Sequence, residues 1–132
     1  LVSDKIDWTP YKGFVYTFDE TKDIAWLYLV SDMLITDYSS VMFDYSILNR
    51  PMLFFAYDLE DYKENLRGFY FDFVNDIPGP ISRDTDQLIK DIKEYNEDSW
   101  KEKYKNYHDK FNGIDDGHAS QKVIDVIKKV SR

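Results

Sequence analysis

Residues 34–44 read Leu-Ile-Thr-Asp-Tyr-Ser-Ser-Val-Met-Phe-Asp, an apolar run that passes through small polar residues into a second apolar pattern. The run at 33–36 is short and continuous, as is typical of a strand buried on both faces. From 38 to 49, apolar residues recur at helical spacing, which predicts a helix of about three turns. A buried strand that leads directly into a helix is the repeating unit of a parallel α/β sheet.

The flanking sequence extends this pattern on both sides. Pro51 breaks the helix, and the apolar run at 52–56 predicts a second buried strand. Upstream, a β-favouring run predicts a strand at 14–17, and a periodic segment predicts a helix at 23–31. Strands and helices that alternate through short connections indicate an α/β fold, a Rossmann-like parallel sheet flanked by helices with right-handed crossovers.

The rest of the chain is predicted to be mainly helical. Periodic patterns indicate helices at 84–95, 99–111 and 119–130. The Pro-Gly-Pro sequence at 78–80 is a rigid turn element. The aromatic run at 69–73 is more typical of a core than of a surface that binds a ligand.

The composition excludes several classes of protein and site. The chain has 132 residues, which fits one domain, and 43% of them are hydrophobic. It has no cysteine, which excludes disulfides and thiolate zinc sites. Its net charge is −8, and the first 80 residues hold 14 acidic and 6 basic side chains. Such a chain repels nucleic acid, so no nucleic-acid partner is expected, and no metal or cofactor is expected either.

The junction between the first buried strand and its helix is a candidate anion site. With Ser39 as the N-cap, the next backbone N–H groups lack partners within the helix and lie at the positive end of its dipole. The junction also follows the carboxyl end of a strand, where open α/β sheets bind ligands. Ordinary helix capping explains Asp37, Ser39 and Ser40 equally well, so these residues alone leave both interpretations open.

Four other residues are candidates for ligand contacts. Arg67, which glycine follows, can bind a phosphate through two hydrogen bonds. Tyr57 can stack on a base and Asp58 can accept a hydrogen bond from a ribose hydroxyl, although a turn and a helix cap explain both residues as well. Asp116 can contact a substrate hydroxyl, or it can simply cap the last helix.

An ordered set of short motifs resembles one known family. The set consists of residues 34–44, Asn49–Phe55, Tyr57–Tyr62, Arg67–Phe71, Pro78–Ile81, and Asp115–Gly117 with Ala119 and Ser120. In this order the motifs resemble the CDP-glycerol poly(glycerophosphate) glycerophosphotransferase family, which builds teichoic-acid-like polymers. The resemblance covers nearly the whole chain, from residue 13 to residue 126.

The resemblance implies a glycosyltransferase-B architecture in which this chain is the C-terminal, donor-binding half. Residues 1–132 are then a single domain of a longer transferase, and the start at Leu1 is expected to be a truncated end. The implied reaction moves glycerol phosphate from CDP-glycerol to a teichoic-acid-like or cell-surface polymer and releases CMP. The implied diphosphate-binding residues are Ser39, Ser40, Asp37 and Arg67, and the implied nucleotide or glycerol contacts are Tyr57, Asp58 and Asp116.

The resemblance also implies that the catalytic groups lie outside this chain. The family is thought to use histidines in its N-terminal half and in a loop before residue 1, so neither His108 nor His118 is expected to be catalytic, and the isolated chain is expected to be inactive. A polymer or lipid-linked acceptor is expected to bind through the missing half. Exposed apolar surface is expected where that half docks, and a homo-oligomer is compatible with it. The expected location is cytoplasmic, at the inner face of a bacterial membrane.

Two alternatives stay open at this point. A nucleotide-sugar glycosyltransferase or epimerase also places small polar residues at a helix N-terminus beneath a diphosphate. A scaffold domain that kept the fold and lost its chemistry would also lack the histidines. Calorimetry with CDP-glycerol and with UDP-sugars would separate the first alternative from the transferase, and the sequence before residue 1 would separate the second.

Overall fold

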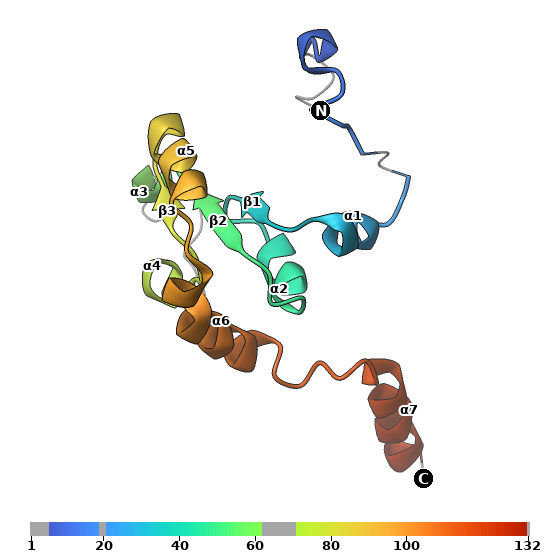
Figure 1. The fold of residues 1–132 in the computed structure, drawn as a ribbon. Helices are drawn as coiled ribbons and strands as arrows, with labels where there is room; N and C mark the ends of the chain where they lie inside the picture. Colours follow the sequence, from blue (N-terminus) through green and yellow to red (C-terminus); the bar gives the residue numbers. More distant parts are fainter. Residues whose placement is uncertain (1–5, 19–20, 62–70, 132) are drawn as a thin grey trace. The chain divides into compact units, whose positions relative to one another are not determined.

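A computed structural model of the chain describes residues 6–18, 21–61 and 71–131, in two compact units, Leu1–Val30 and Ser31–Arg132 (Figure 1). The first unit contains a short 3-10 helix, Thr9–Tyr11, and helix α1, Ala25–Val30. Helix α1 confirms the helix predicted at 23–31. Asp23 Oδ1 accepts a hydrogen bond from the backbone N–H of Ala25 at 2.9 Å and so orders the chain at the start of this helix.

The strand predicted at 14–17 is wrong. Gly13 has φ +87°, a left-handed conformation that suits glycine. The N–H groups of Phe14 and Val15 both donate to the carbonyl oxygen of Tyr11 at 2.9 Å, which closes the chain into a turn. β-favouring side chains form a strand only where the tertiary structure gives them a partner strand, and here the turn takes their backbone groups instead.

The second unit is built on a three-stranded parallel sheet. Its strands are β1, Leu34–Thr36, β2, Met52–Phe55, and β3, Ile81–Ser82, in the order β1-β2-β3 (Figure 1). Leu34 pairs with Met52, and Phe54 pairs with Ile81. The predicted fold class, an α/β parallel sheet flanked by helices, is therefore confirmed.

Six helices in the described residues accompany this sheet: α2, Val41–Ser46; α3, Leu59–Asp61; α4, Phe73–Asp76; α5, Thr85–Lys93; α6, Glu97–Phe111; and α7, Ala119–Val130. The last three confirm the predicted helices to within a turn. Helix α2 is shorter than the predicted 38–49. Its last turn tightens, because the N–H groups of Leu48 and Asn49 bond three residues back, and Asn49 then ends it at φ 51°.

The core lies between the sheet and the helices that follow β1 and β2. Phe54 on β2 is fully buried and meets Phe73 of α4 edge to face, with ring centroids 5.6 Å apart. Phe43 of α2 stacks on Tyr107 of α6 at 5.9 Å. The core interpretation of the aromatic run at 69–73 is confirmed for its described members, since Phe71 and Phe73 both pack against these rings.

Helix α7 carries an apolar face that the described structure leaves exposed. Val123 is 58% exposed, Ile127 55% and Val130 78%. The exposed apolar surface expected from the sequence is therefore present on this helix. Among the residues that the structure describes, no helix has the length and apolar character needed to cross a bilayer.

Candidate functional site

The three parallel strands bring their carboxyl ends to one edge of the sheet, where α/β proteins bind ligands. Asp37 follows β1, Tyr57 and Asp58 follow β2 after one alanine, and Arg83 follows β3. The pairing of Phe55 with Ser82, continued by a bond from Ala56 N–H to Ser82 O at 2.9 Å, holds the last two of these strand ends side by side. Three of the predicted site residues thus share this edge.

The junction between β1 and α2 is on the surface. Asp37 and Ser40 are exposed and Ser39 is half-buried. Asp37 Oδ1 accepts a hydrogen bond from the N–H of Ser39 at 2.9 Å, and Ser39 Oγ lies 3.5 Å from the N–H of Val41. The start of α2 therefore faces outward, but the chain's own side chains already contact the N–H group of Ser39, just before the helix, and that of Val41, its first residue.

Ser39 was predicted to be the N-cap of this helix, and this detail is wrong. The capping position belongs to Ser40, whose φ of −60° and ψ of −12° are helical and whose side chain makes no capping hydrogen bond. An N-cap side chain accepts a hydrogen bond from the N–H groups of the first turn only when its own backbone is not helical. Because the backbone of Ser40 is helical, its hydroxyl does not reach those groups. Ser40 is consequently exposed with its hydroxyl uncommitted to the helix, and Ser39 provides the weak contact to Val41.

A shallow hollow adjoins this junction. It has a volume of about 360 Å³ and is lined by Ile35, Thr36, Asp37 and Phe55, at the carboxyl ends of β1 and β2. Ile35 is 46% exposed although it lies in the middle of a strand. A sheet face that is open at this point can accommodate an apolar group beside the polar junction.

Tyr38 and Asp58 form a bond that ties the first two strand ends together. The Tyr38 hydroxyl donates to Asp58 Oδ1 at 2.8 Å. Burial, and then the hydrogen bond to this carboxylate, raise the pKa of Tyr38 well above its usual range. Tyr38 therefore stays a neutral hydrogen-bond donor at physiological pH. Asp58 has a defined role in holding Tyr38, which the turn-and-cap interpretation did not include.

Tyr57 and Arg83 complete the edge. Tyr57 is 70% exposed, and its ring centroid lies 5.8 Å from that of Phe55, so much of the ring can be reached by a ligand. Arg83 bonds to Glu60 at 3.0 Å, and both side chains are exposed. Arg83 was not among the predicted site residues, because β3 was not predicted. The feature of the sequence that could have identified Arg83 is its position directly after the Pro-Gly-Pro turn and the two residues of β3.

Two predicted site residues remain, Arg67 and Asp116. Arg67 lies outside the described residues. Asp116 lies before α7, where its Oδ1 accepts the N–H of His118 at 3.0 Å and its Oδ2 pairs with Lys122 at 3.0 Å. The N-cap of α7 is His118, which makes no side-chain capping bond. The capping interpretation of Asp116 is therefore wrong, and its carboxylate instead orders the turn before the helix.

The Asp116 pair predicts a pH effect. The Lys122 ammonium, and then the His118 N–H, lower the pKa of Asp116 below 3.8. A carboxyl whose pKa is depressed by folding stabilises the protein above its unfolded pKa, and that contribution is lost as the pH falls through the folded pKa. NMR titration of the Asp116 carboxyl carbon should give the lowered pKa, and Lys122→Ala should raise it. An unchanged pKa in that variant would exclude the ion pair in solution.

Within the described part of the chain, the histidines and acidic residues do not form a metal centre. His108 is half-buried on α6, with Nδ1 3.7 Å from Asp109 Oδ1, and His118 is exposed. No cluster of three or more potential metal ligands occurs in the ranges 6–18, 21–61 and 71–131. What the carboxyl edge can offer a ligand is a set of hydroxyl groups, an accessible ring and a paired arginine.

A sequence model of one family, "CDP-Glycerol:Poly(glycerophosphate) glycerophosphotransferase", matches residues 1–129. The chain belongs to this family. The resemblance inferred from the ordered motifs is thereby confirmed.

Curated relatives and solved structures of this glycerophosphotransferase family agree. The chain is 45% identical to the teichoic acid poly(glycerol phosphate) polymerase of Bacillus subtilis over 131 residues, 98% of this chain and 18% of the relative. It is 43% identical to the teichoic acid glycerol-phosphate transferase of Staphylococcus aureus, covering 98% of this chain and 33% of the relative. The solved structure of the wall teichoic acid polymerase TagF matches with TM-score 0.84 at 43% identity, over 97% of this chain and 32% of that one. The chain thus spans between 18% and 33% of the length of these proteins.

Proposed function

We propose that this chain is the donor-binding part of a glycerophosphotransferase. It holds CDP-glycerol while glycerol phosphate passes to a teichoic-acid-like polymer and CMP leaves. Two of the similar proteins are named for the transfer or polymerisation of glycerol phosphate, and one solved neighbour was soaked with CDPG. The observation that carries the proposal is the serine pair between β1 and α2, of which Ser40 is exposed, beside an open hollow at the carboxyl edge of the sheet.

The serine pair is the proposed diphosphate contact. The exposed Ser40 hydroxyl and the neighbouring Ser39 can donate to phosphate oxygens, and the positive end of α2 adds to the attraction. Asp37 carries a negative charge that a diphosphate would repel, so it acts by orienting Ser39 through their 2.9 Å hydrogen bond. Arg67 keeps its proposed role as a cation for the diphosphate, and Arg83, at the carboxyl edge of the sheet, is a second candidate.

The nucleotide is proposed to lie along the rest of this edge. Tyr57, which is exposed just beyond β2, can stack on a base. Asp58 Oδ1 accepts the hydrogen bond from Tyr38, and its other carboxylate oxygen can accept one from a ribose hydroxyl. Asp116 is proposed to contact the glycerol or nucleotide from the turn before α7. The neutral Tyr38 contributes by fixing the position of Asp58.

The whole activity requires residues beyond this chain. We propose that a histidine outside residues 1–132 acts as the general base toward the acceptor hydroxyl. A polymer or lipid-linked acceptor is proposed to bind through the other half of the longer protein, at the cytoplasmic face of the membrane. The exposed apolar face of α7 supports docking against that half, because an unpartnered face of this kind is normally covered by another protein surface.

The test replaces both hydroxyls, Ser39→Ala with Ser40→Ala, in the longer protein. Two hydrogen bonds to a charged diphosphate are lost, so CDP-glycerol affinity should fall by at least about tenfold. The free energy of unfolding should change by less than about 1 kcal/mol, because the Ser40 side chain makes no capping hydrogen bond. Isothermal titration calorimetry measures the affinity, and Ser99→Ala on the exposed surface of α6 is the matched control.

Two results would count against the proposal. Unchanged donor affinity in the double variant would remove the serine pair as the diphosphate site. Tighter binding of a UDP-sugar than of CDP-glycerol by the unaltered protein would favour a nucleotide-sugar enzyme instead.

A further inference from the structure

The segment that follows β2 is held in place on both sides by buried residues. Ala56 and Leu59 are both fully buried, so the backbone that flanks Tyr57 and Asp58 is fixed in the core. The hydrogen bond from Ala56 N–H to Ser82 O, 2.9 Å long, also ties this segment to β3. Tyr57 and Asp58 are therefore carried at the carboxyl edge on a backbone that is ordered without a ligand.

The side chain of Asp58 is fixed separately, through Tyr38. The Tyr38 hydroxyl donates to Asp58 Oδ1 at 2.8 Å. The Tyr38 ring lies against Phe73, with ring centroids 5.5 Å apart, and Phe73 in turn meets Phe54 at 5.6 Å. Phe73 and Phe54 are both buried. Because the Tyr38 ring is anchored on the core in this way, its hydroxyl holds the Asp58 carboxylate in one orientation.

Asp58 keeps one carboxylate oxygen for a ligand. Its Oδ1 is bonded to Tyr38, and within the residues that the structure describes no side chain or backbone group bonds to its Oδ2. Asp58 is half-buried, so this oxygen is partly shielded from water. A carboxylate accepts hydrogen bonds and repels phosphate oxygens. On a nucleotide its partner is therefore a hydroxyl or an amino group, and not the diphosphate.

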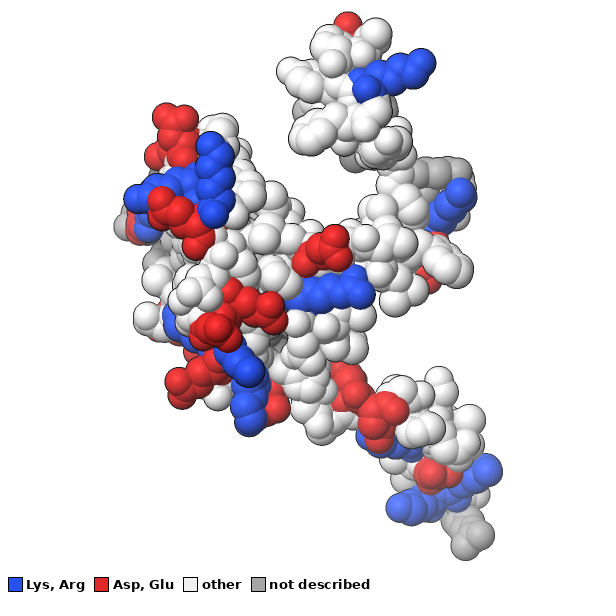
Figure 2. All heavy atoms as spheres, in the orientation of Figure 1, with Lys and Arg blue, Asp and Glu red and all other residues white. Residues whose placement is uncertain are grey.

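General electrostatic attraction does not explain how this chain would hold a nucleotide. The chain carries a net charge of −8. Over α5 and α6 the face seen in Figure 2 has acidic and basic side chains next to one another, without a broad basic patch. Affinity and selectivity for an anionic ligand therefore depend on individual hydrogen bonds, such as the one that Asp58 can accept.

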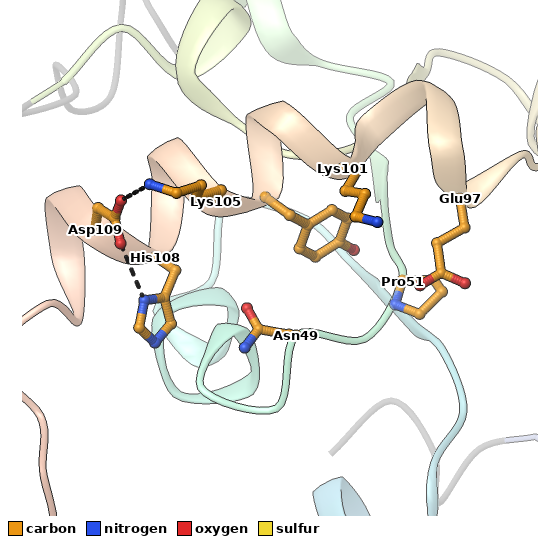
Figure 3. Close-up of a pocket in the computed structure, with 8 residues that line it drawn as sticks. Asn49, Pro51, Glu97, Lys101, Lys105, His108 and Asp109 are labelled. Carbon is orange, nitrogen blue, oxygen red and sulfur yellow. Dashed lines mark hydrogen bonds and ion pairs between the residues drawn. The ribbon is translucent and has the colours of Figure 1, made fainter.

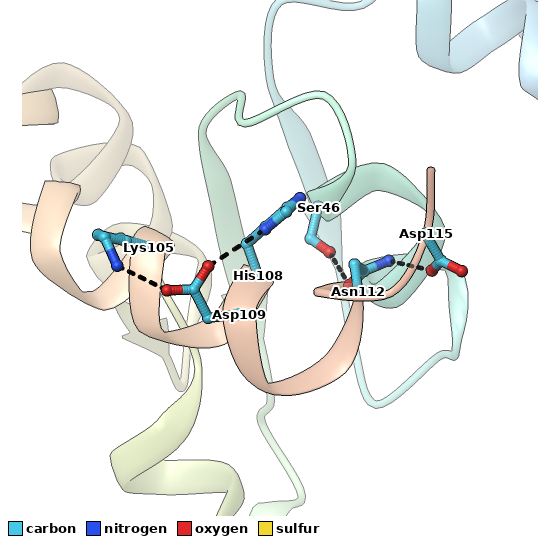
Figure 4. Close-up of polar contacts among 6 residues, drawn as sticks. All are labelled: Ser46, Lys105, His108, Asp109, Asn112 and Asp115. Atoms are coloured by element: carbon cyan, nitrogen blue, oxygen red, sulfur yellow. Dashed lines mark hydrogen bonds and ion pairs between the residues drawn. The ribbon is translucent and has the colours of Figure 1, made fainter. Parts of the chain in front are cut away.

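Another cavity in the described part of the chain suits a nucleotide less well. It lies between the α2–β2 connection and α6, where two lysines and two carboxylates line it (Figure 3). One pair is already formed, since Lys105 bonds to Asp109 at 2.6 Å. Behind it, α2 and α6 are joined by the bond between Ser46 Oγ and Asn112 Oδ1 at 2.8 Å (Figure 4). The lysines and carboxylates of this cavity offer a diphosphate no net positive charge, so the nucleotide is placed at the carboxyl edge.

We propose that Tyr38 is a specificity-determining residue of the donor site, because it orients Asp58 toward a ribose hydroxyl of the nucleotide. Asp58 Oδ2 accepts a hydrogen bond from that hydroxyl, and Tyr38 acts only through Asp58, as a positioning residue. A deoxynucleotide that lacks the hydroxyl leaves the oriented carboxylate unpaired and is rejected. Tyr38 has this role only if the carboxyl edge holds the nucleotide as proposed above.

The test compares CDP with its 2′-deoxy and 3′-deoxy analogues by isothermal titration calorimetry on the longer protein. The unaltered protein should bind one of the two analogues about tenfold more weakly than CDP, because a hydrogen bond to a charged group is lost. Tyr38→Phe keeps the ring against Phe73 but frees the carboxylate, so the ratio should fall below about threefold. A purely structural role for Tyr38 would weaken all three nucleotides alike and leave the ratio unchanged.

Two further variants locate the effect. Asp58→Ala removes the acceptor itself and should make the ratio close to one. Tyr107→Phe is the matched control, because Tyr107 is buried against Phe43 and its hydroxyl has no hydrogen-bond partner in the described structure. This control should leave the ratio at the value of the unaltered protein.

The possible failures can be told apart. If the unaltered protein binds all three nucleotides equally, or if Tyr38→Phe keeps the full ratio, Tyr38 does not determine specificity, although donor binding at this edge stands. If Asp58→Ala changes the preference for CDP over UDP and not the ratio, the carboxylate contacts the base and the ribose contact is excluded. A protein that binds none of the three nucleotides would overturn the proposed function, and the role of Tyr38 with it.

Discussion

Replacing Gly79 with alanine is expected to destabilise the protein by more than about 3 kcal/mol, the upper part of the range for overpacked sites. A Cβ atom at this position would lie 1.9 Å from the carbonyl oxygen of Met52 and 2.9 Å from its carbonyl carbon. Both atoms are backbone of β2, so no side chain can move aside. The neighbouring bond from Phe54 N–H to Pro80 O, 3.0 Å long, pairs β2 with the start of β3 and would be lost as the two segments separate.

The matched variant is Gly117→Ala. Gly117 has φ +77° and no atom within 4 Å of an added Cβ, so only the left-handed backbone is strained. That strain costs about 1 to 2 kcal/mol. Urea unfolding of the two variants should therefore show a clearly larger loss for Gly79→Ala. Equal losses would mean that the close approach of the Pro-Gly-Pro turn to β2 is not needed for stability.

This close approach also explains why β3 could not be predicted from the sequence. Strand β1, helix α2 and strand β2 could be, because two continuous apolar runs flank a segment with helical spacing, and Pro51 marks the break between the helix and the second run. Ile81 and Ser82 are too short a run to show any period. They form a strand only because Gly79 lets the turn lie against β2, and that is a property of the folded structure.

The candidate site divides in the same way. The serine pair at the start of α2 follows from the local order of strand, polar residues and helix, which is visible in any such sequence. The bond between Tyr38 and Asp58 joins residues 20 positions apart, and no local pattern predicts it. Arg83 became visible only once β3 placed it at the carboxyl edge. The hydrogen bond between Ser46 and Asn112 could not be foreseen either, because it depends on how α2 packs against α6.

Replacing Asn112 with aspartate is also expected to cause a large loss of stability, because Asn112 links α6 to α2. The amide group of Asn112 donates to Phe43 O at 3.0 Å, and a carboxylate of the same shape would face that carbonyl with an acceptor instead. Asp115 Oδ2, 3.4 Å from the amide nitrogen, would add repulsion between like charges. A buried charge without a partner costs about 3 to 5 kcal/mol when one member of a pair is removed, and a loss of this order is expected at pH 7.

The loss of stability in the Asn112→Asp variant should increase as the pH rises. Burial raises the pKa of a carboxyl group, so the folded variant would hold its proton to higher pH than the unfolded chain. Stability would then decline as the pH rises above the unfolded pKa of about 3.9 and level off above the folded pKa. Urea unfolding at pH 4 and pH 7 measures this, with Asn106→Asp on the exposed surface of the same helix as the control. A variant equally stable at both pH values would show that the carboxylate reaches water and that the two helices are not locked together.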